Sequence, residues 1–295
     1  MTQIASLSSA SYSYIEQAFL SAWNATCGTT TGLSTFIVPS DKIFLLKPLT
    51  FKGPCNSSYV DVQVRNHNIK NYSSVFAYSI AGTLIPPDTP STWKGIDASL
   101  WLQFASVDGL TLSGSGDDCI SVGDNTYNIV IQGIACGPGH GISVGSLGRG
   151  GSNVSVEEIH VSFAKLFNTT NGVRIKTWQG GTGYAKSISF DRINFNNVQN
   201  PIIIDQYYCD VRHRCANQTN AVQISNVTYS YLSGTSKTDV AISLNCSQSV
   251  ACTGMHFKNV NITAASSGRD VQSFCINAHG DSKGDVHPDM ACLSM

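Results

Sequence analysis

Three short clusters in this 295-residue chain carry side chains that could perform acid–base chemistry on a charged substrate. They are Ser-Gly-Asp-Asp-Cys at 115–119, Cys-Gly-Pro-Gly-His-Gly at 136–141 and Arg-Ile-Lys at 174–176. Together they supply two carboxylates, one imidazole and two cations. Carboxyl groups can donate and accept protons, and the cations can hold an anion. The clusters therefore predict a site that holds and cuts an anionic polymer.

Charge and hydropathy exclude several classes of function. Only 13% of the residues are charged and the formal net charge is -1. A protein that binds nucleic acid normally carries a basic excess or a basic patch. No run of about 18 apolar residues is present, so the sequence predicts no membrane span. We expect a monomer whose partners are neither nucleic acid nor membrane.

Short strands separated by turns must position the three clusters. One helix is predicted over Tyr14–Trp23, because its apolar residues fall on one face. Apolar strand cores then recur about every 22 to 39 residues, at 119–122, 141–144, 172–175, 201–204 and 240–243. Such a repeat without intervening helices favours a parallel β-helix. We therefore expect one all-β domain over residues 1–295, with the helix capping the open end of the first coil.

Stacked coils give the clusters a predicted geometry. Asp118 and His140 lie 22 residues apart, about one coil, so they can be neighbours on adjacent strands. Arg174 and Lys176 are two residues apart on a strand and must project to the same face. Asp117 and Asp118 are adjacent, so they can share a cleft only if the chain bends near Gly116.

Cysteine usage indicates an oxidising compartment. The chain has 10 cysteines but no pair of Cys-x-x-Cys motifs, which favours disulfides over zinc. Connectivity does not follow from sequence alone. The pairs that we expect are Cys119–Cys136, Cys209–Cys215, Cys246–Cys252, Cys27–Cys55 and Cys275–Cys292.

Asn-x-Ser/Thr sequons also point to a secreted glycoprotein. They occur at Asn24, Asn56, Asn71, Asn153, Asn168, Asn217, Asn226, Asn245 and Asn261, whereas chance would give roughly four. Stacked Asn and Thr ladders in a β-helix would also inflate this number. The segment Met1–Ala10 has no basic region followed by an apolar one. We therefore expect a chain truncated at its N-terminus, which lacks its signal peptide.

The clusters resemble a known family in wording and order. Gly-Asp-Asp-Cys at 116–119, Cys-Gly-Pro-Gly-His-Gly with its continuation through 148, and Arg-Ile-Lys are similar to the polygalacturonases of glycoside hydrolase family 28. The segments 22–27, 51–55, 107–110 and 201–206 resemble its plant members. This resemblance implies a right-handed parallel β-helix. It also implies a secreted protein that acts outside the cell, in the cell wall. It also implies inverting hydrolysis of α-1,4-galacturonosyl links in pectin, an acidic polysaccharide, without metal or other cofactor.

The resemblance also assigns roles by position. Asp117 would be the general acid, and Asp118 would orient and deprotonate the attacking water. His140 would sustain the protonation state of the acid. Arg174 and Lys176 would bind a uronate carboxylate, Arg174 through its planar fork and Lys176 as a point charge.

The sequence departs from the family in one respect that bears on activity. The Asn-Thr-Asp-Gly motif that supplies a third catalytic Asp is absent, and the early-coil segment 107–114 runs directly into Ser115. We therefore expect that several coils are missing near residues 113–116. Asp97, 20 residues before Asp117, is a weak substitute. A pectin-binding protein with impaired catalysis is the alternative, and a metal-dependent hydrolase with Asp117, Asp118 and His140 as ligands is a third, less favoured one.

Overall fold

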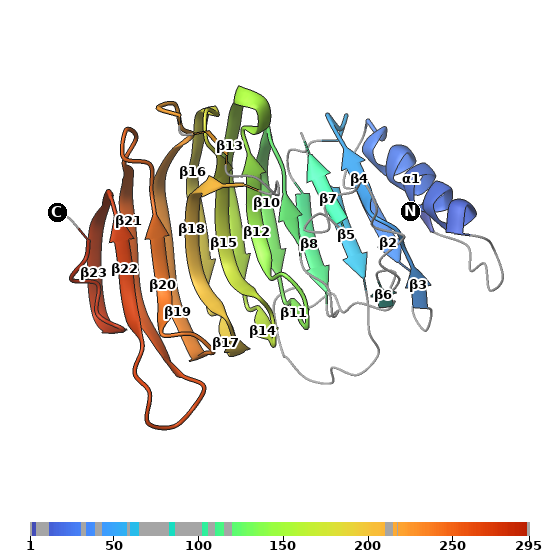
Figure 1. Cartoon of the computed structure of the whole chain (residues 1–295). Coiled ribbons are helices and arrows are strands. Elements are labelled where there is room, and N and C mark those ends of the chain that lie inside the picture. The colour runs from blue at the N-terminus through green and yellow to red at the C-terminus, as the bar shows by residue number, and fades with distance from the viewer. Residues whose placement is uncertain are drawn as a thin grey trace.

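Parallel strands stack side by side from the N-terminal helix α1 to the C-terminal strand β23 (Figure 1). The computed structural model describes residues 2–3, 12–30, 34–38, 43–57, 60–64, 83–85, 102–105, 110–114, 120–209, 215–216 and 218–293. Every strand pairing within the described residues is parallel, and pairing partners lie in successive coils. The structure thus confirms the parallel β-solenoid that the sequence repeat predicts.

Two long sheets make up the walls of the solenoid. The larger sheet has 13 described strands: β1 (Thr2–Gln3), β2 (Ser34–Val38), β5 (Val60–Val64), β8 (Leu110–Gly114), β10 (Thr126–Gln132), β11 (Ala135–Cys136), β13 (Asn153–Ser162), β14 (Lys165–Phe167), β16 (Thr182–Asp191), β17 (Asn194–Val198), β19 (Gln223–Ser236), β21 (Cys252–Ala264) and β23 (Ala278–His287). The smaller sheet has eight: β4 (Leu49–Lys52), β7 (Leu102–Ala105), β9 (Ser121–Val122), β12 (Ile142–Leu147), β15 (Asn171–Trp178), β18 (Asn200–Tyr208), β20 (Val240–Asn245) and β22 (Gln272–Ile276). A third pairing joins β3 (Ile43–Leu45) to β6 (Thr83–Ile85), and a short 3-10 helix covers Arg149–Gly151.

The core runs along the inside of the coils because side chains alternate between the two faces of each strand. In the larger sheet, Phe190, Tyr229 and Phe257 occupy the same inward position of three successive coils. Their rings stack with centroids 5.3 and 4.7 Å apart, and all three side chains are buried. Each coil thus covers the apolar residues of its neighbours, as a solenoid requires.

Helix α1 (Tyr12–Cys27) closes the first coil, as predicted, and is longer than the predicted Tyr14–Trp23. Phe19 and Trp23 are buried beneath it, and their ring centroids lie 5.3 and 5.2 Å from those of Phe44 and Phe51. The Trp23 indole N–H donates to the Lys52 carbonyl at 3.0 Å. The helix therefore covers the apolar end that the first coil would otherwise expose. Within the described residues, no helix is long and apolar enough to span a bilayer.

Four of the five expected disulfides are present among the described residues. They are Cys27–Cys55, Cys209–Cys215, Cys246–Cys252 and Cys275–Cys292. Cys136 is also disulfide-bonded, while Cys119, its expected partner, lies outside the described residues. Cys209–Cys215 and Cys246–Cys252 each close a short loop, whereas Cys27–Cys55 joins the end of α1 to the segment after β4, 28 residues later.

Asparagine ladders account for part of the sequon excess. The Asn197 side-chain amide donates to the Asn168 side-chain oxygen at 2.8 Å, and the Asn226 amide donates to the Ser187 hydroxyl at 3.3 Å. Asn168, Asn197 and Asn226 all have positive φ, a conformation that asparagine tolerates better than most residues. The sequons at Asn168 and Asn226 therefore have a structural reason to exist besides glycosylation.

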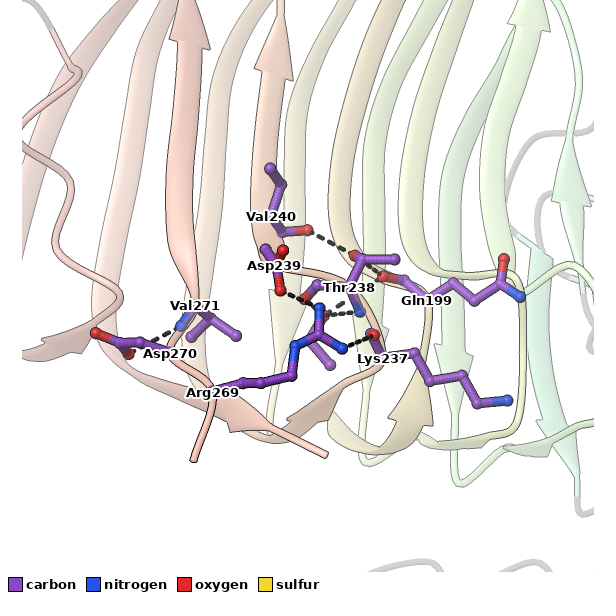
Figure 2. A network of polar contacts seen from close by, with 9 residues as sticks. Gln199, Lys237, Thr238, Asp239, Val240, Arg269, Asp270 and Val271 are labelled. Atoms are coloured by element: carbon purple, nitrogen blue, oxygen red, sulfur yellow. Dashed lines mark hydrogen bonds and ion pairs between the residues drawn. The ribbon is translucent and has the colours of Figure 1, made fainter. Parts of the chain in front are cut away.

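Polar contacts tie together the loops that lead into the last three strands of the smaller sheet (Figure 2). The Arg269 guanidinium pairs with Asp239, and the hydroxyl of Thr238 donates to the Gln199 carbonyl. The Asp270 carboxylate accepts the backbone N–H of Val271 at 2.8 Å. These contacts join the loops at the entrances of β18, β20 and β22 to one another.

Substitution of two glycines that have positive φ, Gly133 and Gly141, would show how tightly the coils stack. A Cβ on Gly141 (φ +83°) would lie 2.0 Å from the Asn171 carbonyl oxygen of the next coil, whereas a Cβ on Gly133 (φ +67°) would meet nothing within 4 Å. We expect Gly133→Ala to cost about 1 kcal/mol, the ordinary penalty of the conformation. Gly141→Ala should cost about 3 kcal/mol or more, because the coils must also move apart. Urea unfolding of both variants measures the difference, and equal losses would contradict this account.

Candidate active site

Arg174 and Lys176 lie on the outward face of the smaller sheet. Register pairs Ser121 of β9 with Ser143 of β12, and Ser143 with Arg174 of β15. The Arg174 Nε–H donates to the Ser143 hydroxyl at 3.0 Å, and the Ser121 hydroxyl donates to the Gly145 carbonyl at 2.7 Å. Ser121, Ser143 and Arg174 therefore form one continuous polar row across three successive coils. The guanidinium of Arg174 is held by Ser143 of the preceding coil.

His140 lies in the turn that leads into β12, and its side chain is exposed. Its carbonyl accepts the Asn171 side-chain amide of the next coil at 3.4 Å. Gly141 follows it, with the close backbone contact described above, so the turn is held against the coil of β15. The predicted partners Asp117 and Asp118, and the weak substitute Asp97, lie outside the described residues.

Lys176 projects to the same face as Arg174, as predicted, but its side chain is completely buried. The ring of Tyr208 covers it, with the ammonium 4.5 Å from the ring centroid, a cation–π contact. Register places Asp205 of β18 directly beside Lys176. A buried cation is costly unless a charge or polar group compensates it, so Asp205 and Tyr208 are part of its environment.

Asp205 is a half-buried carboxyl group beside both predicted cations. Burial raises its pKa above the ordinary value, and three contacts oppose that rise: the backbone N–H of Tyr207, the charge of Arg174 and the charge of Lys176. The Tyr207 N–H donates to the carboxylate at 3.0 Å. Burial prevails, so the site holds a carboxyl group that is protonated more readily than a free Asp.

Sequence reasoning did not single out Asp205 or Tyr208. Asp205 follows the apolar run 201–204, which hides it in a strand core, and Tyr208 comes three residues later. Burial in β18 shows the signal that was available, because Ile202, Ile204 and Gln206 point inward and Asp205 points outward between them. Alternation within β18 shows only that Asp205 points outward, and it is the register that places it beside Lys176.

Aromatic side chains border the cationic pair on the side where the strands end. Trp178 pairs in register with Tyr208, and their rings meet edge to face at 5.1 Å. The Arg149 guanidinium lies over the Trp178 ring, 5.2 Å from its centroid. Asp124, near the end of β9, accepts the Gly148 N–H at 3.2 Å, and burial raises its pKa despite that bond. The described site therefore combines cations, carboxyl groups and aromatic faces.

In the part of the chain that the structure describes, no group of three or more His, Cys, Asp and Glu residues could hold a metal ion. The hypothesis that assigns Asp117, Asp118 and His140 as ligands depends on two residues outside that part.

Comparison with known proteins decides the family. Residues 103–284, more than half of the chain, match Glycosyl hydrolases family 28. The chain belongs to this family. It is 34% identical to a probable polygalacturonase of Arabidopsis thaliana over 355 aligned positions, which cover 95% of this chain and 77% of that protein. It is 33% identical to polygalacturonase-2 of Solanum lycopersicum over 363 positions, covering 96% and 78%. Membership confirms the resemblance drawn from the three clusters and makes the chain a glycoside hydrolase by relationship.

Among solved structures, the fold is similar to that of an endo-xylogalacturonan hydrolase from Aspergillus tubingensis, with a TM-score of 0.57. The match covers 90% of this chain and 73% of that chain at 19% identity. Identity this low supports the likeness of the fold alone.

The pairing of Lys176 with Asp205 predicts a coupled effect on stability. Lys176→Gln should lower the free energy of unfolding by about 2–4 kcal/mol, because it leaves a half-buried carboxylate with one fewer cation. Adding Asp205→Asn should recover a large part of that loss, since no uncompensated charge then remains. Urea unfolding of the two single variants and the double variant at neutral pH measures the coupling. Strictly additive losses would show that the two charges do not interact.

The raised pKa of Asp205 also predicts a pH dependence. A raised folded pKa means that the folded state binds more protons than the unfolded state between the two pKa values, so stability falls as pH rises through that window. Relative to Asp205→Asn, the native protein should therefore gain stability as pH falls from neutral toward the ordinary Asp value of 3.8. Unfolding midpoints of both proteins across this range test the sign. A difference that is constant with pH, or that reverses, would contradict the assignment.

Proposed function

We propose that this protein hydrolyses α-1,4-galacturonosyl links of pectin by an inverting acid–base mechanism, outside the cell in the cell wall. The observation that carries the proposal is the register of the smaller sheet. It places Arg174 and the Lys176–Asp205 pair on one outward face of neighbouring coils, and the turn of His140 directly precedes β12, the strand that pairs with β15. Family membership and the polygalacturonase relatives support the same substrate.

The same register supports a place for the proposed catalytic carboxyl groups. Ser121 pairs with Ser143, 22 residues later. Asp118 and His140 each precede one of these serines by three residues and are therefore separated by the same 22 residues. Asp118 and the neighbouring Asp117 are accordingly proposed to act beside His140, in the coil that precedes Arg174.

Inverting hydrolysis requires an acid on one face of the glycosidic bond and a base on the other. We assign Asp117 as the acid that protonates the leaving oxygen, and Asp118 as the base that deprotonates the attacking water. Two adjacent carboxyl groups repel when both are ionised, which keeps one of them protonated. His140 would hold that proton in place by hydrogen bonding to the acid.

Arg174 is the residue that we assign to bind the uronate carboxylate. As a residue Arg174 is half-buried, its Nη2 atom is buried, and its Nε–H donates to the Ser143 hydroxyl. A planar guanidinium can bind a carboxylate with two parallel hydrogen bonds. Lys176 is fully buried under Tyr208, so its charge acts on the substrate across Tyr208 and Asp205. Both cations still favour an acidic sugar over a neutral one.

We also propose that the solenoid has lost several coils near residues 113–116. Gln103 of β7 pairs with Ser121 of β9, 18 residues later, whereas Asn171 of β15 pairs with Asn200 of β18, 29 residues later. The alignments with relatives run over 355 and 363 positions, although this chain has 295 residues. A short coil and long alignments are what an internal deletion would leave.

A second candidate function is pectin binding with impaired catalysis. It is favoured by the sequence, which has no Asn-Thr-Asp-Gly motif to supply the third catalytic carboxylate. General acid–base groups typically contribute about 10²–10⁴-fold to a rate, so a missing base would reduce turnover by that order. Arg174 and the groove would still bind the polymer.

Release of reducing ends from polygalacturonate separates the two candidates. The native protein should release them, and Asp117→Asn should be slower by about 10²-fold or more. Arg174→Gln should raise KM by roughly tenfold or more, since a charge-assisted hydrogen bond to the substrate is lost. Arg192→Gln is the matched control, because Arg192 pairs with Asp191 at the end of a strand in the larger sheet.

One outcome would decide against hydrolysis and another against the proposed binding face. If the native protein and Asp117→Asn are equally inert while both bind polygalacturonate, the protein is a binding protein. If Arg192→Gln weakens binding as much as Arg174→Gln does, the polymer does not depend on the smaller sheet and the proposed groove is wrong.

A further inference from the structure

A concavity lies beyond Arg174 and Lys176, where β18, β20 and β22 of the smaller sheet end. It has a volume of about 600 Å³, within the range of small-molecule sites. It is lined by Gln179, Tyr207, Gln218, Thr219, Asn245, Ser247, Gln248, Ser249 and Ile276. We call it the amide pocket, because four of these side chains are primary amides. None of these lining residues is charged.

Register connects the amide pocket to the candidate active site. Lys176 pairs with Asp205, Asp205 pairs with Asn245, and Asn245 pairs with Ile276. Neighbouring strands are about 4.8 Å apart, so Asn245 lies roughly 10 Å from Lys176 along the same outward row. A polymer that lies across Arg174 and follows this row therefore reaches the amide pocket after a short distance.

Local bonds hold the walls of the amide pocket in place. The Gln248 backbone N–H donates to the Tyr207 hydroxyl at 3.0 Å, and the Gln218 backbone N–H donates to the Gln179 side-chain oxygen at 3.3 Å. The Ser249 hydroxyl donates to the Thr219 carbonyl. Cys246 and Cys252 close the loop that carries Gln248. Segments from three coils are thus fastened to one another around the pocket.

The lining groups suit hydroxyl groups better than a carboxylate. Each primary amide offers two donors and one acceptor, and each hydroxyl offers one donor and two acceptor positions. A sugar hydroxyl needs both kinds of partner. A uronate carboxylate that enters the pocket would lose water without gaining a cation from these residues, which is unfavourable. The ring of Tyr207 and the side chain of Ile276 add apolar surface for the face of a sugar ring.

A smaller cavity of about 270 Å³ adjoins the amide pocket and shares Gln179 and Gln218 with it. Trp178 and Tyr208 line this smaller cavity. The Trp178 indole N–H is buried and has no hydrogen-bond partner among the described residues. Tyr208 also covers Lys176, so the aromatic pair links the surroundings of this cation to the smaller cavity.

We propose that the amide pocket binds an uncharged sugar residue of the same acidic polysaccharide, either a neutral branch or a methyl-esterified uronate. The inference rests on the proposed function, since it takes the polymer at Arg174 as given. It adds that the protein distinguishes substituted from unsubstituted galacturonan, chiefly through residues of the two coils that follow Arg174, those of β18 and β20.

Binding measurements with three oligosaccharides of equal backbone length test this inference. They are an unsubstituted oligogalacturonate, one with neutral pentose branches and one with methyl esters, each titrated calorimetrically into Asp117→Asn to prevent turnover. At least one uncharged substituent should improve affinity about tenfold or more. Adding Gln218→Ala and Gln248→Ala should abolish that gain, because two neutral hydrogen bonds, each worth roughly fivefold, are lost. Affinity for the unsubstituted oligosaccharide should not change.

The matched control is Gln199→Ala with Gln272→Ala. Both glutamines are exposed and lie where β18 and β22 begin, at the opposite end of the strands from the amide pocket, and Gln199 is visible in Figure 2. This control should keep the preference for the substituted oligosaccharide. If Asp117→Asn shows no preference, or if the preference survives loss of Gln218 and Gln248, the amide pocket is not a sugar site. If none of the three oligosaccharides binds, the proposed function fails as well.

Discussion

Parallel register between successive coils is the constraint on which the rest of this structure depends. A strand sends alternate side chains to opposite faces, so a shift of one residue would turn the core side chains outward and the outward side chains into the core. The buried stack of Phe190, Tyr229 and Phe257 makes such a shift costly. The interior therefore fixes the outward row, although the two sets of residues do not touch. Arg174 lies over Ser143 because the apolar residues on either side of each are locked inside.

Electrostatics of the outward row follow from the same register. Lys176 and Asp205 are neighbours only because β15 and β18 pair without a slip at that point. Burial would make either charge unfavourable alone, and each reduces the cost of the other. Burial still raises the pKa of Asp205, so the pair is sensitive to acid. The outward face that we propose to bind an anionic polymer thus carries a half-buried carboxyl group, and protonation of that group would leave more of the positive charge to the substrate.

The sequence alone predicts the parts of this protein that depend on local patterns. Period-2 runs give the strands, the apolar face of 14–23 gives the helix, and short cysteine spacings give two of the four disulfides described, Cys209–Cys215 and Cys246–Cys252. Asp205 and the amide pocket could not be found in that way. Coils differ in length, with Ile202 of β18 pairing 40 residues later with Ile242 of β20. Without the register, the sequence does not show which residues of the adjacent coils lie beside a given outward residue. Asp205 then looks only like the end of the apolar run 201–204.

Variable coil length also explains how such a fold can keep its family while its chemistry changes. Each coil contacts only its neighbours, so whole coils can be gained or lost if the new neighbours present matching apolar faces. Thr111 of β8 pairs with Val130 of β10, only 19 residues later. The larger sheet is therefore continuous across the short coil where we propose the deletion. The packing of the core therefore does not depend on which outward side chains are lost with the deleted coils. A proposed deletion next to Asp117 would therefore leave stability nearly intact while removing a carboxylate from the groove. In a solenoid, retention of the fold is for this reason weak evidence for retention of catalysis, and the residues on the outward row must be tested one by one.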